Sequence, residues 1–303
     1  MDRIRWGKLR RQEALNALSV LGVPEANAEF LALPDQGLTN LLLSDCKPAL
    51  QVLAQHISDW EPTDLFWPAL ADTHPDHNAL AVLLLLVLRN LLPQPLRFSA
   101  WNFLVHGNDA EFLRSAAPVH PSPEETAAKQ AAIYCHKTQL TLSRRRFLAY
   151  AARPERFANT NGLGIDPRLS QRSSDSHEFT VSVPPIERRL RPSEPKLLMF
   201  GYDLSHCLKS TFASMLNPFG QIELLNWNTG EVVAILPSHG RLSTGLQVAI
   251  PSGIFSADHP IYLKLERRRI FFDESGWIEI PAKTRVVSAP AVDWADEASV
   301  AVG

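Results

Sequence analysis

The feature that most constrains this chain is residues 72–77, Asp-Thr-His-Pro-Asp-His, which place two imidazoles and two carboxylates within six positions. Asp64 to Leu70 is apolar and aromatic and predicts a buried strand, whereas the Ala, Leu and Val positions of Asn78 to Leu92 predict a helix. The polar residues thus occupy a strand-to-helix turn, where open α/β sheets bind ligands. We expect His74 and His77 to reach one point above the strand.

Three other interpretations give this turn no catalytic role. The first is an ordinary surface turn. The second is the His-Pro-Asp tripeptide of J-domain co-chaperones, which follows a basic helix, whereas Trp60 to Leu70 is strand-like. The third is a helix cap by Asp72 or Asp76, which is compatible with a function.

Composition bounds the class of protein. With 303 residues the chain is long enough for about two domains, and 45% hydrophobic residues are ample for a core. A net charge of −2 favours neither nucleic acid nor an anionic membrane as partner. Three dispersed cysteines fit a reduced, cytoplasmic setting. The start lacks a signal peptide, and the apolar run from Ala79 to Leu92 is too short for a transmembrane segment.

The N-terminal half alternates helical and strand patterns, which predicts an α/β fold with a parallel, Rossmann-like sheet. Helices are expected at Leu9 to Leu21, Pro48 to Ser58, Asn78 to Leu92 and Pro123 to Tyr150. Strands are expected at Glu29 to Leu33, Asp64 to Leu70 and Arg97 to Val105, with a turn at Pro34 to Gly37.

The C-terminal half differs in style. We expect a first domain over residues 1–157, a polar linker over 158–194, an antiparallel β-sandwich or barrel over 195–287, and a flexible tail over 288–303. The β domain is expected because short strands alternate with turns at Asn228 to Gly230, Ser238 to Gly240 and Asp273 to Gly276. His206, His239 and His259 lack ligand spacing and are interpreted as surface or structural residues.

Several motifs follow one another in the order found in the LmbE/PIG-L deacetylase family, which residues 6–157 resemble. They are Arg10, Glu13 and Leu21-Gly22; Leu33-Pro34-Asp35; His74 to His77; and the tail Lys129, Gln139, Phe147 and Arg153 to Glu155. The resemblance implies zinc-dependent removal of an N-acetyl group from a GlcNAc-containing glycoconjugate.

The resemblance also implies roles for individual residues. His77 would bind zinc, and His74 would polarise the acyl carbonyl or protonate the leaving amine. Asp76 would orient His74, and Arg10 and Asp35 would contact sugar hydroxyls. This chemistry suits zinc, which needs three protein ligands and an open water position.

One motif of the family is missing. Its His-Pro-Asp-Asp-Glu sequence, which supplies two ligands and the general base, does not occur in the 303 residues. The sequence therefore resembles an N-terminally truncated member, and zinc is expected to bind weakly or not at all. The alternative is a non-catalytic glycan-binding or scaffold protein. A lost strand would also leave apolar surface uncovered, above all on the helix at 79–92, and promote self-association.

Overall fold

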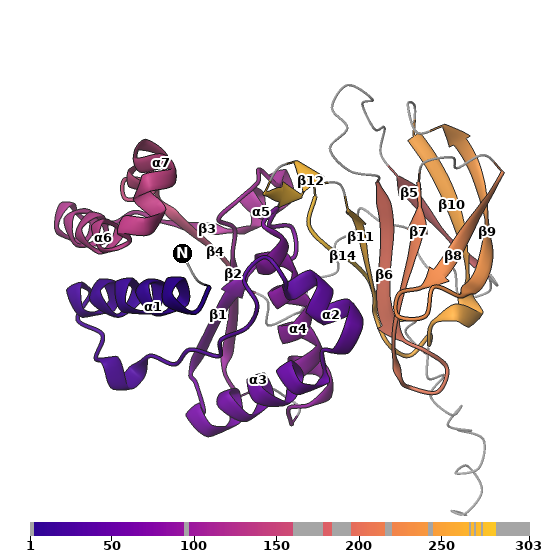
Figure 1. Ribbon diagram of the computed structural model, residues 1–303, viewed down its shortest axis with the longest axis horizontal. Helices are drawn as coiled ribbons and strands as arrows, with labels where there is room; N and C mark the ends of the chain where they lie inside the picture. The colour runs from indigo at the N-terminus through magenta and orange to yellow at the C-terminus, as the bar shows by residue number, and fades with distance from the viewer. Residues whose placement is uncertain are drawn as a thin grey trace, which may run out of the picture.

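The computed structural model describes residues 3–93, 97–159, 178–183, 195–215, 220–241, 245–266, 268–269, 271–273 and 275–282. Its α-helices are α1 (Arg3–Val20), α2 (Leu38–Asp45), α3 (Lys47–Trp60), α4 (Pro75–Asn90), α5 (Ala110–Ser115), α6 (Pro123–Cys135) and α7 (Lys137–Ala149). Short 3-10 helices lie at Glu25–Asn27 and Ser252–Ile254. Two regions result, one with both helices and strands and one built of strands (Figure 1).

The N-terminal region contains a four-stranded sheet in the order β1-β2-β4-β3. Its strands are β1 (Asp64–Pro68), β2 (Ser99–Phe103), β3 (Ala117–Val119) and β4 (Glu155–Asn159). β1 and β2 are parallel and joined through α4, whereas β4 and β3 are added antiparallel. The predicted α/β class is confirmed, with a mixed sheet whose parallel pair carries the predicted histidine turn.

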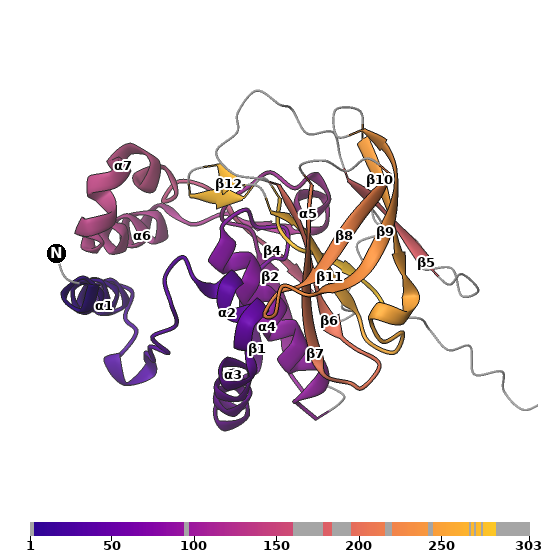
Figure 2. The same cartoon turned by 45° about the vertical axis from the view of Figure 1, so that its right-hand side comes forward.

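The C-terminal region is an eight-stranded antiparallel sheet in the order β14-β11-β6-β7-β8-β9-β10-β5, curved like a half-barrel (Figure 2). Its strands are β5 (Glu178–Val183), β6 (Lys196–Tyr202), β7 (Leu208–Ser214), β8 (Gln221–Asn226), β9 (Val232–Arg241), β10 (Gly245–Pro251), β11 (Ile261–Glu266) and β14 (Ile278–Ile280). A separate hairpin joins β12 (Arg268–Arg269) and β13 (Phe272–Asp273). An antiparallel β domain is therefore confirmed.

Two details of this region correct the sequence interpretation. β5 lies inside the expected linker and pairs with β10, because Phe179, Val181 and Val183 alternate with polar residues in the pattern of a strand. The expected turn at Ser238 to Gly240 is instead part of β9, whose pairing with β10 extends through it. Residues 160–177, 184–194 and 283–303, which hold the rest of the expected linker and the expected tail, lie outside the described residues.

The core joins the two regions through α4. This helix lies between the four-stranded sheet and the β domain (Figure 1). Its residues from Ala81 to Leu88 are all buried, in one cluster with Trp67 of β1 and with Phe200 and Tyr262 of the β domain. The expectation that α4 leaves apolar surface uncovered was wrong, because the β domain covers the side that faces away from the sheet.

The strand expected at Glu29 to Leu33 is not formed. These residues have no regular secondary structure, and Ala32 has a positive φ of 53°. β1 is the end strand of its sheet and pairs, within the described residues, only with β2. An extended segment becomes a strand only when a neighbour accepts its hydrogen bonds, and no described strand does so here. The turn at Pro34 to Gly37 is present, closed by a bond from the Gly37 amide to the Pro34 carbonyl.

Candidate functional site: a histidine cluster on the parallel strands

Asp72 is the residue around which the site is organised. Its side chain is fully buried, and Oδ1 accepts a hydrogen bond from the His74 backbone N–H at 2.8 Å. Oδ2 accepts from the backbone N–H groups of Val105 and His106 at 3.0 and 3.2 Å and lies 3.1 Å from His77 Nδ1. One carboxylate thus binds the loops that follow both parallel strands, β1 and β2.

Three imidazoles gather above this carboxylate. The rings of His74 and His77 stack at 4.5 Å between centroids, and His106 lies 5.7 and 5.3 Å from them. Sequence reasoning brought His74 and His77 together but missed His106. A signal for it existed, because His106 directly follows a predicted strand and the carboxyl ends of parallel strands share one edge of the sheet.

His74, rather than Asp72 or Asp76, is the N-cap of α4, because its Nδ1 accepts from the Asp76 backbone N–H at 3.2 Å. The Asp76 carboxylate accepts instead from the backbone N–H groups of Gln36 and Leu38 at 2.7 and 3.1 Å. Asp76 therefore secures the turn before α2. Its contact with the His74 ring is made by the backbone N–H and not by the carboxylate.

The predicted sugar-contacting residues lie beside the same turn. Arg10 on α1 and Asp35 form an ion pair at 3.8 Å, and both side chains are exposed. The next residue, Gln36, reaches the cluster with its side-chain amide 3.2 Å from His74 Nε2. The structure thus brings Asp35 and His74 to one region of the surface, with Gln36 between them.

The charge states follow from burial and contacts. Burial lowers the pKa of His106 to about 4, although the nearby Asp72 carboxylate opposes the shift. Burial also lowers the pKa of His74, and the neighbouring His77 adds to the effect. Burial raises the pKa of Asp72, but the His77 side chain and the backbone N–H donors outweigh it, so the pKa lies below its ordinary value. At neutral pH the cluster combines a charged carboxylate with neutral His74 and His106.

These contacts set the proton positions. Neutral His74 accepts at Nδ1 from the Asp76 N–H and so carries its proton on Nε2, which donates to the Gln36 side-chain amide when the oxygen of that amide faces it. In its neutral form, His77 donates from Nδ1 to the charged Asp72 and carries the lone pair on Nε2. Metal-binding histidines have this arrangement, with a carboxylate behind the ring.

The donor set for zinc is nevertheless incomplete. Throughout the described ranges, no group of three or more His, Cys, Asp or Glu side chains is placed to hold a metal ion. The described residues supply one suitable ligand, His77, with its supporting carboxylate. They do not fit a complete catalytic zinc site, so we assign no step to the metal.

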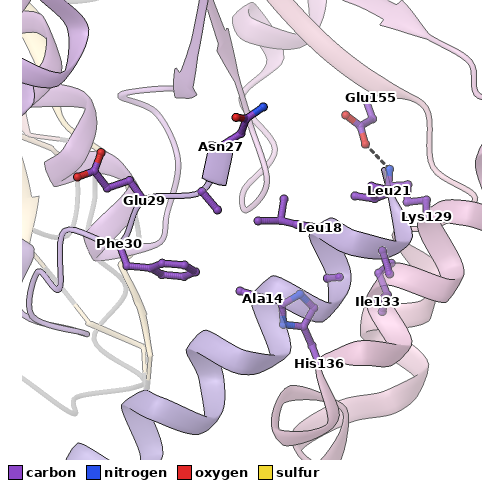
Figure 3. Close-up of a pocket in the computed structure, with 13 residues that line it drawn as sticks. Ala14, Leu18, Leu21, Asn27, Glu29, Phe30, Lys129, Ile133, His136 and Glu155 are labelled. Carbon is purple, nitrogen blue, oxygen red and sulfur yellow. Dashed lines mark ion pairs between the residues drawn. The ribbon is translucent and has the colours of Figure 1, made fainter. Parts of the chain in front are cut away.

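An open groove of about 600 Å³ lies elsewhere, between α1, residues 27–30 and α6 (Figure 3). It is mainly apolar, with Leu18 and Phe30 in its walls and the Lys129–Glu155 ion pair at α6. Glu13 lies on α1 but is buried. Its carboxylate accepts hydrogen bonds from the Thr138 backbone N–H and hydroxyl at 2.9 and 2.6 Å. Glu13 therefore fastens α1 to the start of α7.

The fold and the cluster together define an α/β protein whose His and Asp side chains meet where two parallel strands end. Residues 2–88 match the model of the PIG-L family, described as GlcNAc-PI de-N-acetylase. The resemblance expected from Arg10, Asp35 and His74 to His77 is therefore confirmed, and this segment is PIG-L-like. The family consists of deacetylase-like hydrolases that typically depend on a metal.

Other comparisons add a structural neighbour. The crystal structure of the conserved protein TT1542 from Thermus thermophilus is 21% identical, over 50% of this chain and 73% of that one, with a TM-score of 0.37. No curated protein matches the chain. Among the described residues, none of the helices has the length and apolar character needed to cross a membrane.

Proposed function

We propose that the histidine cluster is part of the active site of a PIG-L-type amide hydrolase that removes an N-acetyl group from a GlcNAc-containing glycoconjugate. The observation that carries this proposal is the pair Asp72–His77 at 3.1 Å, beside His74, within the segment that matches the family. Such a pair suits a metal ligand with its supporting carboxylate. His74, with its proton on Nε2, would donate a hydrogen bond to the acyl carbonyl.

The other predicted site residues would act at the same site. Arg10 and Asp35 would contact sugar hydroxyls, since both are exposed and Gln36 links their turn to His74. Asp76 would act through the Gln36 and Leu38 amides, as a positioning residue for this turn.

We further propose that activity requires the His-Pro-Asp-Asp-Glu motif, which the 303 residues do not contain. Support comes from the edge of β1. Within the described residues this edge has no strand partner, and residues 29–33, which have the composition of a strand, remain irregular. A strand added beside β1 would bring a motif at its carboxyl end next to His77, because parallel strands end at the same edge.

Acetate release from N-acetylglucosamine conjugates tests this function. The 303-residue chain is compared, in the presence of zinc, with the same chain extended by an apolar strand that ends in His-Pro-Asp-Asp-Glu. We expect release from the extended chain only. The release should be lost on His77→Gln and kept on His56→Gln, a matched control on α3 whose imidazole pairs with Glu29.

Two results would contradict the proposal. Acetate release that survives His77→Gln would place the reaction elsewhere. An extended chain that binds N-acetylated sugars without releasing acetate would favour the glycan-binding alternative.

A further inference from the structure

The β domain reaches into the histidine cluster through the β12–β13 hairpin. The ring of Phe272 lies 4.9 Å from His106 and meets His74 edge-on at 5.8 Å, between centroids. The guanidinium of Arg146 on α7 lies 5.7 Å from the centre of the same ring. In both views the hairpin sits apart from the rest of the β domain (Figures 1 and 2).

A buried polar network holds this hairpin in place. The Asp273 backbone N–H donates to the Thr73 carbonyl at 2.8 Å, and its carboxylate is ion-paired with Lys264 of β11. Asn78 of α4 accepts from Lys264 at 3.2 Å and donates to the Asp273 carboxylate at 3.3 Å and to the Asp72 carbonyl at 3.0 Å. The network thus connects the residue after Phe272 to the backbone of the residue that organises the site.

A second attachment lies four residues further on. The Trp277 backbone N–H donates to the Leu70 carbonyl at 2.9 Å. Gly276 lies so close that a Cβ there would overlap the Leu70 carbonyl and the Ala71 backbone, so this approach requires glycine. The segment after β1 is therefore bonded to Asp273 and to Trp277, and these two attachments, which both follow Phe272 in the chain, hold Phe272 beside the site.

We propose that Phe272 is a specificity-determining residue of the histidine site, where its ring forms a wall against the C–H face of the substrate's sugar ring. The choice of a sugar rests on the proposed function. The half-buried ring leaves part of its surface for a ligand, and it also contacts the Arg146 guanidinium and the imidazoles of His106 and of His74, which would donate to that ligand. Aromatic faces suit such contacts because they offer a large apolar area in a fixed orientation. Lys264 is the positioning residue that anchors the wall.

Chemical modification of histidines tests the wall without requiring activity. The full chain is treated with diethyl pyrocarbonate, and the modification rate of each histidine is read by peptide mass spectrometry. Phe272→Ala should raise the rates at His74 and His106 several-fold and leave those at His56 and His120 unchanged. Phe271→Ala is the matched control, because Phe271 is the neighbouring ring and is 65% exposed. It should change none of the rates.

Phe272→Leu separates shielding of the histidines by the ring from loss of the folded structure, because it keeps an apolar side chain at this position. It should give rates at His74 and His106 between those of the wild type and Phe272→Ala. A higher modification rate at every histidine in Phe272→Ala would indicate unfolding. The rates in Phe272→Leu would then decide whether Phe272 shields His74 and His106. Unchanged rates at His74 and His106 in both variants would overturn the proposal.

Added N-acetylglucosamine tests the ligand. It should slow modification of His74 and His106 in the wild type and in Phe271→Ala, but not in Phe272→Ala. Equal protection in all three would overturn the specificity role of Phe272. Absence of protection in the wild type, with the two histidines still more reactive in Phe272→Ala, would count against the sugar substrate and leave the wall in place.

Discussion

Helices α1 and α4 both carry many apolar residues, yet the structure treats them differently. Every residue of α4 from Ala81 to Leu88 is buried, between the four-stranded sheet on one side and the β domain on the other. On α1, Leu9 and Val20 are 40% and 45% exposed, and Leu21, just after its end, is 51% exposed. The local sequence therefore predicts both helices, whereas the burial of each helix depends on which other elements pack against its sides.

The polar contacts of the two helices differ in the same way, with partners in the β domain for α4 and an exposed partner for α1. Arg89 of α4 pairs with Glu279 at 2.8 Å and donates to the Tyr262 hydroxyl at 3.0 Å, both in the β domain. Arg10 of α1 has an exposed partner, Asp35. The histidine site begins at the first turn of α4, which packs against both regions. The geometry of the site should therefore depend on the β domain.

The largest effect is expected at the buried ion pair between Lys264 and Asp273. Lys264→Met should lower the free energy of unfolding by about 3–5 kcal/mol, because it leaves the Asp273 carboxylate buried without its cation. The double variant Lys264→Met/Asp273→Leu should recover most of that loss. Urea unfolding of the three chains measures both values, and a double variant less stable than the single one would contradict this account.

A smaller effect is expected from the apolar residues of the two helices. Leu83→Ala, at a fully buried site on α4, should cost about 2–5 kcal/mol through lost burial and the cavity left behind. Leu21→Ala, beside α1, should change the free energy of unfolding by no more than about 0.5 kcal/mol, because the side chain is half exposed. Similar losses for the two variants in urea would mean that α1 is covered by something that this structure does not hold.

The smallest effect is expected at the ion pair of Arg10 and Asp35. A double-mutant cycle with Arg10→Ala and Asp35→Ala should give a coupling energy of about 0.2–1 kcal/mol, since both side chains are exposed. The coupling should shrink at high salt. A coupling above about 2 kcal/mol that ignores salt would show a buried pair instead.

The local elements of the site were predictable because they depend on short patterns. The apolar run before Asp72 predicted β1, and the Ala, Leu and Val positions after His77 predicted α4. Segments whose state depends on distant partners were not. Residues 29–33 have the composition of a strand but no described neighbour to pair with, and the single turn of polar residues at 238–240 was absorbed into β9.

Contacts between distant parts of the chain were also out of reach. From the sequence, Asp72 was a candidate helix cap. Its hydrogen bonds to the Val105 and His106 amides were not predictable, because they depend on the packing of two parallel strands. Phe272 had no signal at all. It lies far beyond Asp72 in the sequence and reaches His106 only because Asp273 and Trp277 bond to the segment after β1.

The central claim is that the two regions build the histidine site together, and hydrogen exchange of two amides tests it most directly. The Asp273 and Trp277 N–H groups bond to the Thr73 and Leu70 carbonyls across the boundary between the regions. We predict that in the native state they open with the same free energy as the amides of Val87 and Leu88 in the core of α4, as members of one cooperative unit. Exchange at rates typical of frayed loops, while α4 stays protected, would show that the β domain separates from the site and would contradict the claim.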